Sequence, residues 1–186
     1  ITADDDLLAG GDISAAAGST LRGNTVNLTG SNITTNIVTS DVGNLTITGA
    51  NEVTLNDTTT ATAAQVIVNA DANDVNVNGT VNAATGVTLD AAGQNSDVIV
   101  NAAVTTAAGD ITIQADDSVR FAAAGDVTAT GAGNVLVNAN RVNTVGDDGD
   151  QILMADGTTR FLNESVSANT LQSLITRASG DQPGDF

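Results

Sequence analysis

The feature that most constrains the fold of this chain is a repeat with a period of about 22 residues. Short segments in which apolar and polar residues alternate recur as TVNLTG, NLTITG, QVIVNA, GVTLDA, DITIQA and NVLVNA. Their first apolar residues are Val26, Leu45, Val66, Val87, Ile111 and Val135. Successive members of this first set lie 19, 21, 21, 24 and 24 residues apart. Such regularity predicts a repeat architecture in which each unit packs on its neighbours.

Two further sets of alternating segments keep the same period. The second set contains EVTLND, DVNVNG, DVIVNA and SVRFAA, led by Val53, Val75, Val98 and Val119. The third set contains TVNA, AVTT and DVTA, led by Val81, Val104 and Val127. Three short strands in each repeat describe one coil of a parallel β-helix, with one side of every strand turned inward. We therefore expect an all-β, right-handed parallel β-helix of about seven coils, since parallel crossovers are nearly always right-handed.

The residues between the predicted strands are mostly Gly, Ala, Asn and Asp, in steps such as AD, AG, NG and AAG. We expect Gly and Asn to supply positive φ angles at these short corners. Asn also recurs in register after the strands of the second set, at Asn56, Asn78 and Asn101. These side chains are expected to stack into a ladder of amide hydrogen bonds, which is a structural role and not a ligand site.

The repeat weakens toward both ends of the chain. Residues 4–23 predict a short first coil, and the sequence after Val142 predicts a last, distorted one. The inward side chains of the first coil would be Leu8, Ile13 and Leu21. We therefore assign residues 1–163 to the β-helix domain.

Residues 164–186 break the pattern. The apolar residues that have helical spacing there are Val166, Leu171, Leu174 and Ile175. A short helix ending at Gly180 would cap the β-helix, whose unpaired strand edges otherwise favour polymerisation. A linker helix to a further domain is the alternative, and the tail after it is expected to be loose. Because the chain begins with Ile1 and not with Met, we expect a segment or a processed product.

The charge of the chain argues against several classes of partner. It contains 22 acidic residues, 20 of them Asp, and five Arg without any Lys, so its net charge is −17. Nucleic acid and anionic membrane surfaces need basic partners, and we expect neither to bind. No apolar run approaches the ~18 residues of a membrane span, so no membrane insertion is expected. The absence of Cys excludes disulfides and thiolate metal sites.

The composition also limits catalysis. The chain has no His, Cys, Tyr or Lys, which removes most pairs of nucleophile and base. Parallel β-helices include pectin-degrading hydrolases that use clustered Asp, and GDD at residues 146–148 is the candidate cluster. Those enzymes also need a His and basic groups, whereas the nearest Arg here is Arg141. We therefore predict no enzyme activity and no catalytic residues.

The acidic segment GDDGD, residues 146–150, is the candidate metal site. It brings the carboxylates of Asp147, Asp148 and Asp150 around one Gly, and Ca²⁺ takes six to eight oxygen ligands. The segment lacks the Glu of an EF-hand, and a solvated acidic turn is the competing interpretation. Calcium is the one cofactor that the sequence suggests.

Two binding functions remain as alternatives. Ice-binding solenoids display flat arrays of Thr-x-Thr, and the outward residues of the first set are Asn27, Thr46, Ile67, Thr88, Thr112 and Leu136. This ladder is irregular, because Ile67 and Leu136 interrupt it. A carbohydrate-binding groove would need aromatic platforms. The only aromatic residues are Phe121, Phe161 and Phe186.

The segments AGGDISAAAGSTL (9–21) and AAGDITIQADDSVRF (107–121) resemble the haemagglutinin-type repeats of bacterial filamentous haemagglutinins, which are exported by two-partner secretion. The pattern is a Gly, then Asp or Asn, then apolar–Thr–apolar and a small-residue turn, and it covers roughly residues 7–160. The resemblance implies a right-handed β-helical stalk outside the cell, with a role in adhesion, biofilm or contact-dependent delivery. We therefore expect a structural or adhesive segment of an extracellular or cell-surface protein. Its partners would include copies of itself, joined head to tail, and a receptor or glycan that the sequence does not identify.

Overall fold

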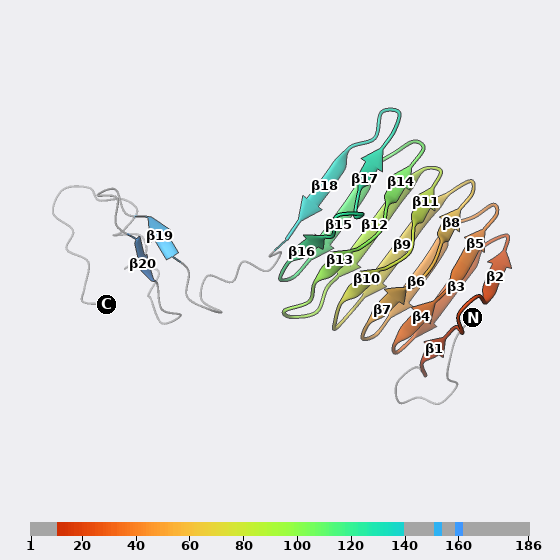
Figure 1. Ribbon diagram of the computed structural model, residues 1–186, viewed down its shortest axis with the longest axis horizontal. Helices are drawn as coiled ribbons and strands as arrows, with labels where there is room; N and C mark the ends of the chain where they lie inside the picture. Colours follow the sequence, from red (N-terminus) through yellow and green to blue (C-terminus); the bar gives the residue numbers. More distant parts are fainter. Residues whose placement is uncertain (1–10, 140–150, 154–158, 162–186) are drawn as a thin grey trace. The chain divides into compact units, whose positions relative to one another are not determined.

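The first compact unit of the protein is a parallel β-solenoid. The computed structural model describes residues 11–139 and, further on, two short strands at 151–153 and 159–161. The contacts divide the chain into two units, Ile1–Val142 and Asn143–Phe186. In the first unit six coils are stacked so that each contributes one strand to each of three parallel sheets, as Figure 1 shows from β1 (red) to β18 (cyan).

The three sheets are named here after their first strands. Sheet 1 contains β1 (Ile13–Ser14), β4 (Ile33–Thr35), β7 (Val53–Leu55), β10 (Val75–Val77), β13 (Val98–Val100) and β16 (Val119–Phe121). Sheet 2 contains β2 (Thr20–Gly23), β5 (Ile37–Ser40), β8 (Thr59–Ala61), β11 (Val81–Ala83), β14 (Val104–Thr106) and β17 (Val127–Ala129). Sheet 3 contains β3 (Val26–Gly30), β6 (Leu45–Gly49), β9 (Gln65–Ala70), β12 (Gly86–Ala91), β15 (Ile111–Ala115) and β18 (Val135–Asn138).

The register of the sheets confirms the repeat seen in the sequence. In sheet 3 the leading residues of the first set are paired one after another: Val26, Leu45, Val66, Val87, Ile111 and Val135. The leading residues of the second set pair in the same way in sheet 1, and those of the third set pair in sheet 2. The predicted all-β parallel β-helix is therefore confirmed, with six described coils.

The core is a set of apolar columns that run from coil to coil. Alternate residues of each strand point inward, and Leu45, Val66 and Leu89 in sheet 3 are all 0% exposed. Each such side chain contributes about 1.5–3 kcal/mol when fully buried. One coil has no other layer to bury its apolar side chains against, so the stability of this fold comes from stacking.

The last residue of each of the first five strands of sheet 3 is small and points inward. This column contains Gly30, Gly49, Ala70, Ala91 and Ala115. A Cβ atom at Gly49 would lie only 2.9 Å from the carbonyl oxygen of Glu52 and 2.9 Å from Cγ2 of Val53. The chain turns into sheet 1 at this corner, and the bend leaves no room for a larger side chain.

The expected role of Gly and Asn at the corners was wrong for most corners. Among the described residues, positive φ angles occur only at Gly18, Gly109, Gly131 and Asn95. The other corners bend with ordinary φ angles, because they join strands of adjoining sheets and not the two strands of a hairpin. Glycine is needed there for space, since a Cβ atom at Gly79 would clash with the carbonyl group of Asp57 in the preceding coil.

The structure agrees with the predicted first coil of the β-helix but not with the predicted last one. Ile13 and Leu21 pack against the core as expected for a first coil, while Leu8 lies outside the described residues. At the other end, β19 (Gln151–Leu153) pairs antiparallel with β20 (Thr159–Phe161), and neither joins the three sheets. These two strands are therefore not the last parallel coil that the sequence predicted. The boundary at 163 and the helix in 164–186 lie outside the described residues.

Candidate interaction surfaces

The outward side chains of the solenoid also form columns, and the column predicted on sheet 3 is one of them. Its members stand in register from coil to coil: Asn27, Thr46, Ile67, Thr88, Thr112 and Leu136. The apolar side chains of Ile67 and Leu136 interrupt it, as the sequence indicated. Sheet 3 has the longest strands, so it offers the broadest outer surface.

A more regular polar column lies on the outer surface of sheet 2 and was not predicted. Its members are Arg22, Thr39, Thr60, Asn82, Thr105 and Thr128. Neighbours in this column bond to each other where Thr105 Oγ1 donates to Asn82 Oδ1 over 2.7 Å. The sequence pattern that could have predicted this column is in the third set of segments. The residues that follow the leading Val there are Asn82, Thr105 and Thr128, one period apart.

The predicted asparagine ladder is confirmed. Asn78 Nδ2 donates to Asn56 Oδ1 at 3.2 Å, and Asn101 Nδ2 donates to Asn78 Oδ1 at 2.8 Å. All three side chains belong to exposed residues at the corner after sheet 1. Asn78 and Asn101 therefore each donate to the preceding coil, and the group has the structural role that its spacing indicated.

Another polar column precedes the strands of sheet 1 and connects consecutive coils. Its members are Asp12, Asn32, Glu52, Asp74, Asp97 and Ser118. Asp74 Oδ1 accepts from the backbone N–H of Asp97 at 2.8 Å, and Asp97 Oδ1 accepts from the backbone N–H of Ser118 at 3.0 Å. Several of the many Asp residues thus bind backbone groups of the next coil, which makes them structural.

The most buried of these carboxylates has a cationic partner. Asp97 is 8% exposed, and its Oδ2 lies 2.9 Å from Nη2 of Arg120. The hydroxyl and backbone N–H of Ser118 donate to its other oxygen. Because a buried charge is costly unless it is paired and hydrogen-bonded, these contacts explain how Asp97 is tolerated at this corner.

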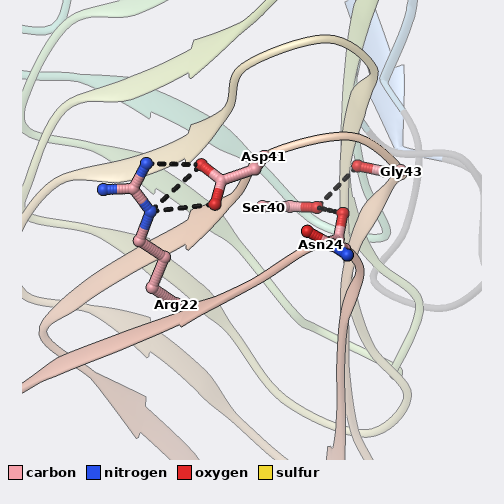
Figure 2. Close-up of polar contacts among 5 residues, drawn as sticks. All are labelled: Arg22, Asn24, Ser40, Asp41 and Gly43. Atoms are coloured by element: carbon pink, nitrogen blue, oxygen red, sulfur yellow. Dashed lines mark hydrogen bonds and ion pairs between the residues drawn. The ribbon is translucent and has the colours of Figure 1, made fainter.

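A second ion pair lies near the beginning of the solenoid, where Figure 2 shows its geometry. Nη2 of Arg22 lies 2.9 Å from Oδ1 of Asp41, and Nε of Arg22 donates to both carboxylate oxygens. The side-chain hydrogen bond from Arg22 lowers the pKa of Asp41, and the same contact raises the pKa of Arg22. Beside this pair, Ser40 Oγ donates to the carbonyl groups of Asn24 and Gly43, which holds the corner between sheets 2 and 3.

The pKa of one more carboxyl group is shifted in the first coil. Asp12 Oδ1 accepts from the backbone N–H of Asn32 at 3.0 Å and from Asn32 Nδ2 at 2.9 Å. These bonds favour the charged form and lower the pKa of Asp12. The direction agrees with a carboxylate that connects coils, since a depressed pKa stabilises the folded state at neutral pH.

The candidate calcium ligands Asp147, Asp148 and Asp150 lie outside the described residues. Within the described residues, no three acidic side chains come close enough together to hold a metal ion. Calcium binding at GDDGD therefore stays a prediction from the sequence. No helix in the described part of the chain is long and apolar enough to cross a membrane.

Both ends of the described stack expose apolar groups. In the last coil Val135 is 45% exposed, Val137 is 43% exposed and Phe121 is 46% exposed. Between the first and second coils a cavity of about 150 Å³ opens among apolar side chains that include Ile13 and Leu21. The two ends differ in this respect from the middle coils, where the corresponding positions are buried.

No family model matches this chain, and neither a curated protein nor a solved structure is found to be similar to it. The class of the protein is therefore defined by its fold alone, as an all-β parallel β-solenoid with three sheets. This fold is compatible with structural and binding roles.

Proposed function

We propose that this chain is a non-enzymatic structural or adhesive segment of a bacterial extracellular or cell-surface protein. The observation that carries the proposal is the uninterrupted stack of six coils, in which buried columns continue from coil to coil. The outer surface between the two ends consists mainly of small polar side chains arranged in columns. The resemblance of segments 9–21 and 107–121 to filamentous haemagglutinin repeats supports the extracellular role.

The proposed mechanism is mechanical. Every coil is hydrogen-bonded to its neighbours through three sheets, and polar ladders such as Asn56–Asn78–Asn101 add side-chain bonds in the same direction. Each coil extends the solenoid by about 4.8 Å, so the number of coils sets the distance that the segment spans. A stack of this kind would hold other modules apart from each other or away from a cell surface.

The high negative charge supports the same role. A net charge of −17 keeps separate molecules apart through repulsion and favours solubility outside the cell. Several of these carboxylates are also bound to backbone N–H groups of a neighbouring coil, as Asp74 and Asp97 are. The acidic composition therefore serves both stability and solubility.

Antibody labelling of intact cells of the source organism tests the proposed location. An antibody against residues 11–139 is expected to label cells that have not been permeabilised, or to find the protein in the medium. An antibody against a cytoplasmic protein serves as the control and should label only permeabilised cells. Labelling of this chain only after permeabilisation would remove the extracellular proposal.

A second candidate function is binding of ice or of a carbohydrate to a flat outer surface. The regular Thr and Asn column on sheet 2, which includes Thr60, Asn82 and Thr105, is the observation that favours it. Freezing hysteresis of the purified chain tests ice binding, and a glycan array tests carbohydrate binding. Activity that is lost in a Thr105→Lys chain but kept in a Thr46→Lys chain would favour this second candidate.

A further inference from the structure

The last described coil ends in strands whose outer edge is unpaired within the described part of the chain. Strands β16, β17 and β18 are the terminal members of sheets 1, 2 and 3. The inward residues Val135 and Val137 continue columns that are 0–2% exposed one and two coils earlier, but here they are 43–45% exposed. Unpaired edges of this kind accept further strands.

The first described coil offers the complementary end. Strands β1, β2 and β3 are the opposite terminal members of the same three sheets. Ile13 and Leu21 are only partly buried, and the cavity between coils one and two opens beside them. A new coil that packed on this end would cover side chains that are otherwise exposed.

The two ends match in register as well as in apolarity. If β18 of one copy paired with β3 of the next, Val135 would be the register partner of Val26, and Val137 would be the register partner of Leu28. In sheet 2, Val127 would continue into Leu21 in the same way. At these three positions the apolar columns of one copy would continue into apolar residues of the next.

Charge also fits this arrangement. Within the chain, Arg22 has Thr39 as its register partner and reaches the carboxylate of Asp41, two residues further on. In the stacked arrangement, Arg22 of one copy would have a second register partner, which is Thr128 of the preceding copy. Asp126 lies two residues before Thr128, exposed at the beginning of β17, so it would be a diagonal neighbour of Arg22 on the side away from Asp41, within the range that long charged side chains span.

We propose that the end formed by β16, β17 and β18 binds the end formed by β1, β2 and β3 of a second copy of this chain. The contact is head to tail, so it is not closed and generates a filament. This inference deepens the proposed structural role and rests on it for its biological meaning, although its test needs only the purified chain. Net charge opposes the contact, so assembly should increase when salt shortens the range of repulsion between copies.

Analytical ultracentrifugation of the full 186-residue chain tests the proposal. At ~10 mM salt, where the Debye length is ~30 Å, the chain is expected to sediment as a monomer of 18.4 kDa. At ~150 mM salt, where this length falls to ~8 Å, multiples of that mass should appear with rising concentration. Electron microscopy should then show unbranched rods.

A pair of charge variants separates the proposed contact from general repulsion. Asp126→Arg and Asp71→Arg make the same change in net charge at exposed positions, but only Asp126 lies at an end. Asp126→Arg should require about tenfold more protein for the same degree of assembly, because two Arg side chains would then be diagonal neighbours across the contact. Asp71→Arg should assemble at least as well as the parent chain.

Circular dichroism of both variants should match the parent chain, which keeps the comparison valid. The proposal is overturned if the parent chain stays monomeric at every salt and protein concentration. It is also overturned if both variants assemble equally well. Either result would leave the extracellular labelling experiment unaffected, so failure of the inference is distinguishable from failure of the proposed function.

Discussion

At the scale of single residues, the coils of this solenoid are joined by polar side chains as well as by apolar columns. Asn78 bonds to the coil before it and the coil after it, and Asp97 bonds to Ser118 in the following coil. Each bond is modest, because a hydrogen bond contributes about 0.5–1.5 kcal/mol net. Because these bonds recur along the stack, their summed contribution to the stability of the fold is significant. They also fix the register of one coil on the next.

The asparagine ladder gives a prediction at this scale. Asn78→Ala removes two side-chain hydrogen bonds, one to Asn56 and one from Asn101, and should lower the free energy of unfolding by about 1 kcal/mol. Urea denaturation measures this change. Asn73→Ala, at an exposed position in the same coil, is the matched control and should stay within about 0.5 kcal/mol of the parent chain. Equal effects at both positions would mean that the ladder adds no stability.

The ion pair between Arg22 and Asp41 gives a prediction about pH. The pKa of Asp41 is lowered below its ordinary value of 3.8, so the pair stabilises the folded state above that pH. This stabilisation is lost as the pH falls through the lowered pKa. Arg22→Gln should therefore be less stable than the parent chain at neutral pH, and the difference should close in acid. The effect is small, because the Arg22 side chain is 68% exposed.

Urea denaturation over a series of pH values measures the difference between the two chains, and NMR titration follows the carboxyl group of Asp41. The pKa of Asp41 should rise toward its ordinary value in the Arg22→Gln chain. A stability difference that stayed constant into the acid range, with an unchanged titration of Asp41, would contradict this role of the pair.

At the scale of elements, the strands are short and the corners decide how closely they pack. The column of Gly30, Gly49, Ala70, Ala91 and Ala115 lies where sheet 3 turns toward sheet 1. Its members are all buried, although none is large. This column shows that the interior narrows at the corner, so volume is limited there more strictly than in the middle of the sheet.

Added volume at this corner should therefore destabilise the fold. Ala91→Val places two methyl groups in a position that is 0% exposed and should cost about 1–3 kcal/mol in free energy of unfolding. The next residue provides the control, since Ala92 is exposed and Ala92→Val should change stability by less than about 0.5 kcal/mol. Urea denaturation again measures the change. A stable Ala91→Val chain would show that the corner has room to spare.

The strands could be predicted from the sequence because their alternation and their period are both local patterns. Val87, for example, was correctly placed between Val66 and Ile111, since stacking requires like residues one period apart. The small corner column was visible as the final Gly or Ala of each hexapeptide, but its meaning depends on the bend of the chain. The outer column of sheet 2 was overlooked for a related reason, because the third set of segments is short and its pattern is weak.

Two features were beyond sequence reasoning for physical reasons. The φ angles at corners such as Gly79 depend on how the three sheets meet. The sequence does not show whether a glycine is needed there because a Cβ atom would clash or because the backbone has a positive φ angle. The antiparallel pair of β19 and β20 also interrupts a stretch that contains the same residue types as the repeat. The candidate calcium ligands Asp147, Asp148 and Asp150 are a local motif whose geometry the structure does not describe.

At the scale of the whole molecule, a solenoid differs from a closed domain because a complete coil can be removed. Deletion of residues 53–74 removes β7, β8 and β9 and joins Glu52 to Val75, which repeats the junction of Asp74 and Val75. The chain should still fold with five coils and should be shorter by about 4.8 Å. Circular dichroism and small-angle X-ray scattering measure both outcomes.

The matched control for this deletion is the removal of residues 53–63, which is half a coil. It deletes β7 and β8 but keeps β9, so the remaining strands can no longer stack on their own sheets. This chain should lose its β-structure or unfold at a much lower urea concentration. If the two deletions were equally harmful, the molecule would not be modular in the way that a spacer of variable length requires.

Cysteine cross-linking tests the central claim, the stacking of coils in register, most directly. The chain contains no Cys, so introduced pairs react without competition. Thr88 and Thr112 are register partners in neighbouring coils, where Cα atoms about 5 Å apart are suited to a disulfide. Thr46 and Thr88 lie two coils apart on the same surface. Under mild oxidation the Thr88→Cys/Thr112→Cys chain should form its internal disulfide readily and the Thr46→Cys/Thr88→Cys chain should not, whereas the opposite order of reactivity would contradict the stacked solenoid.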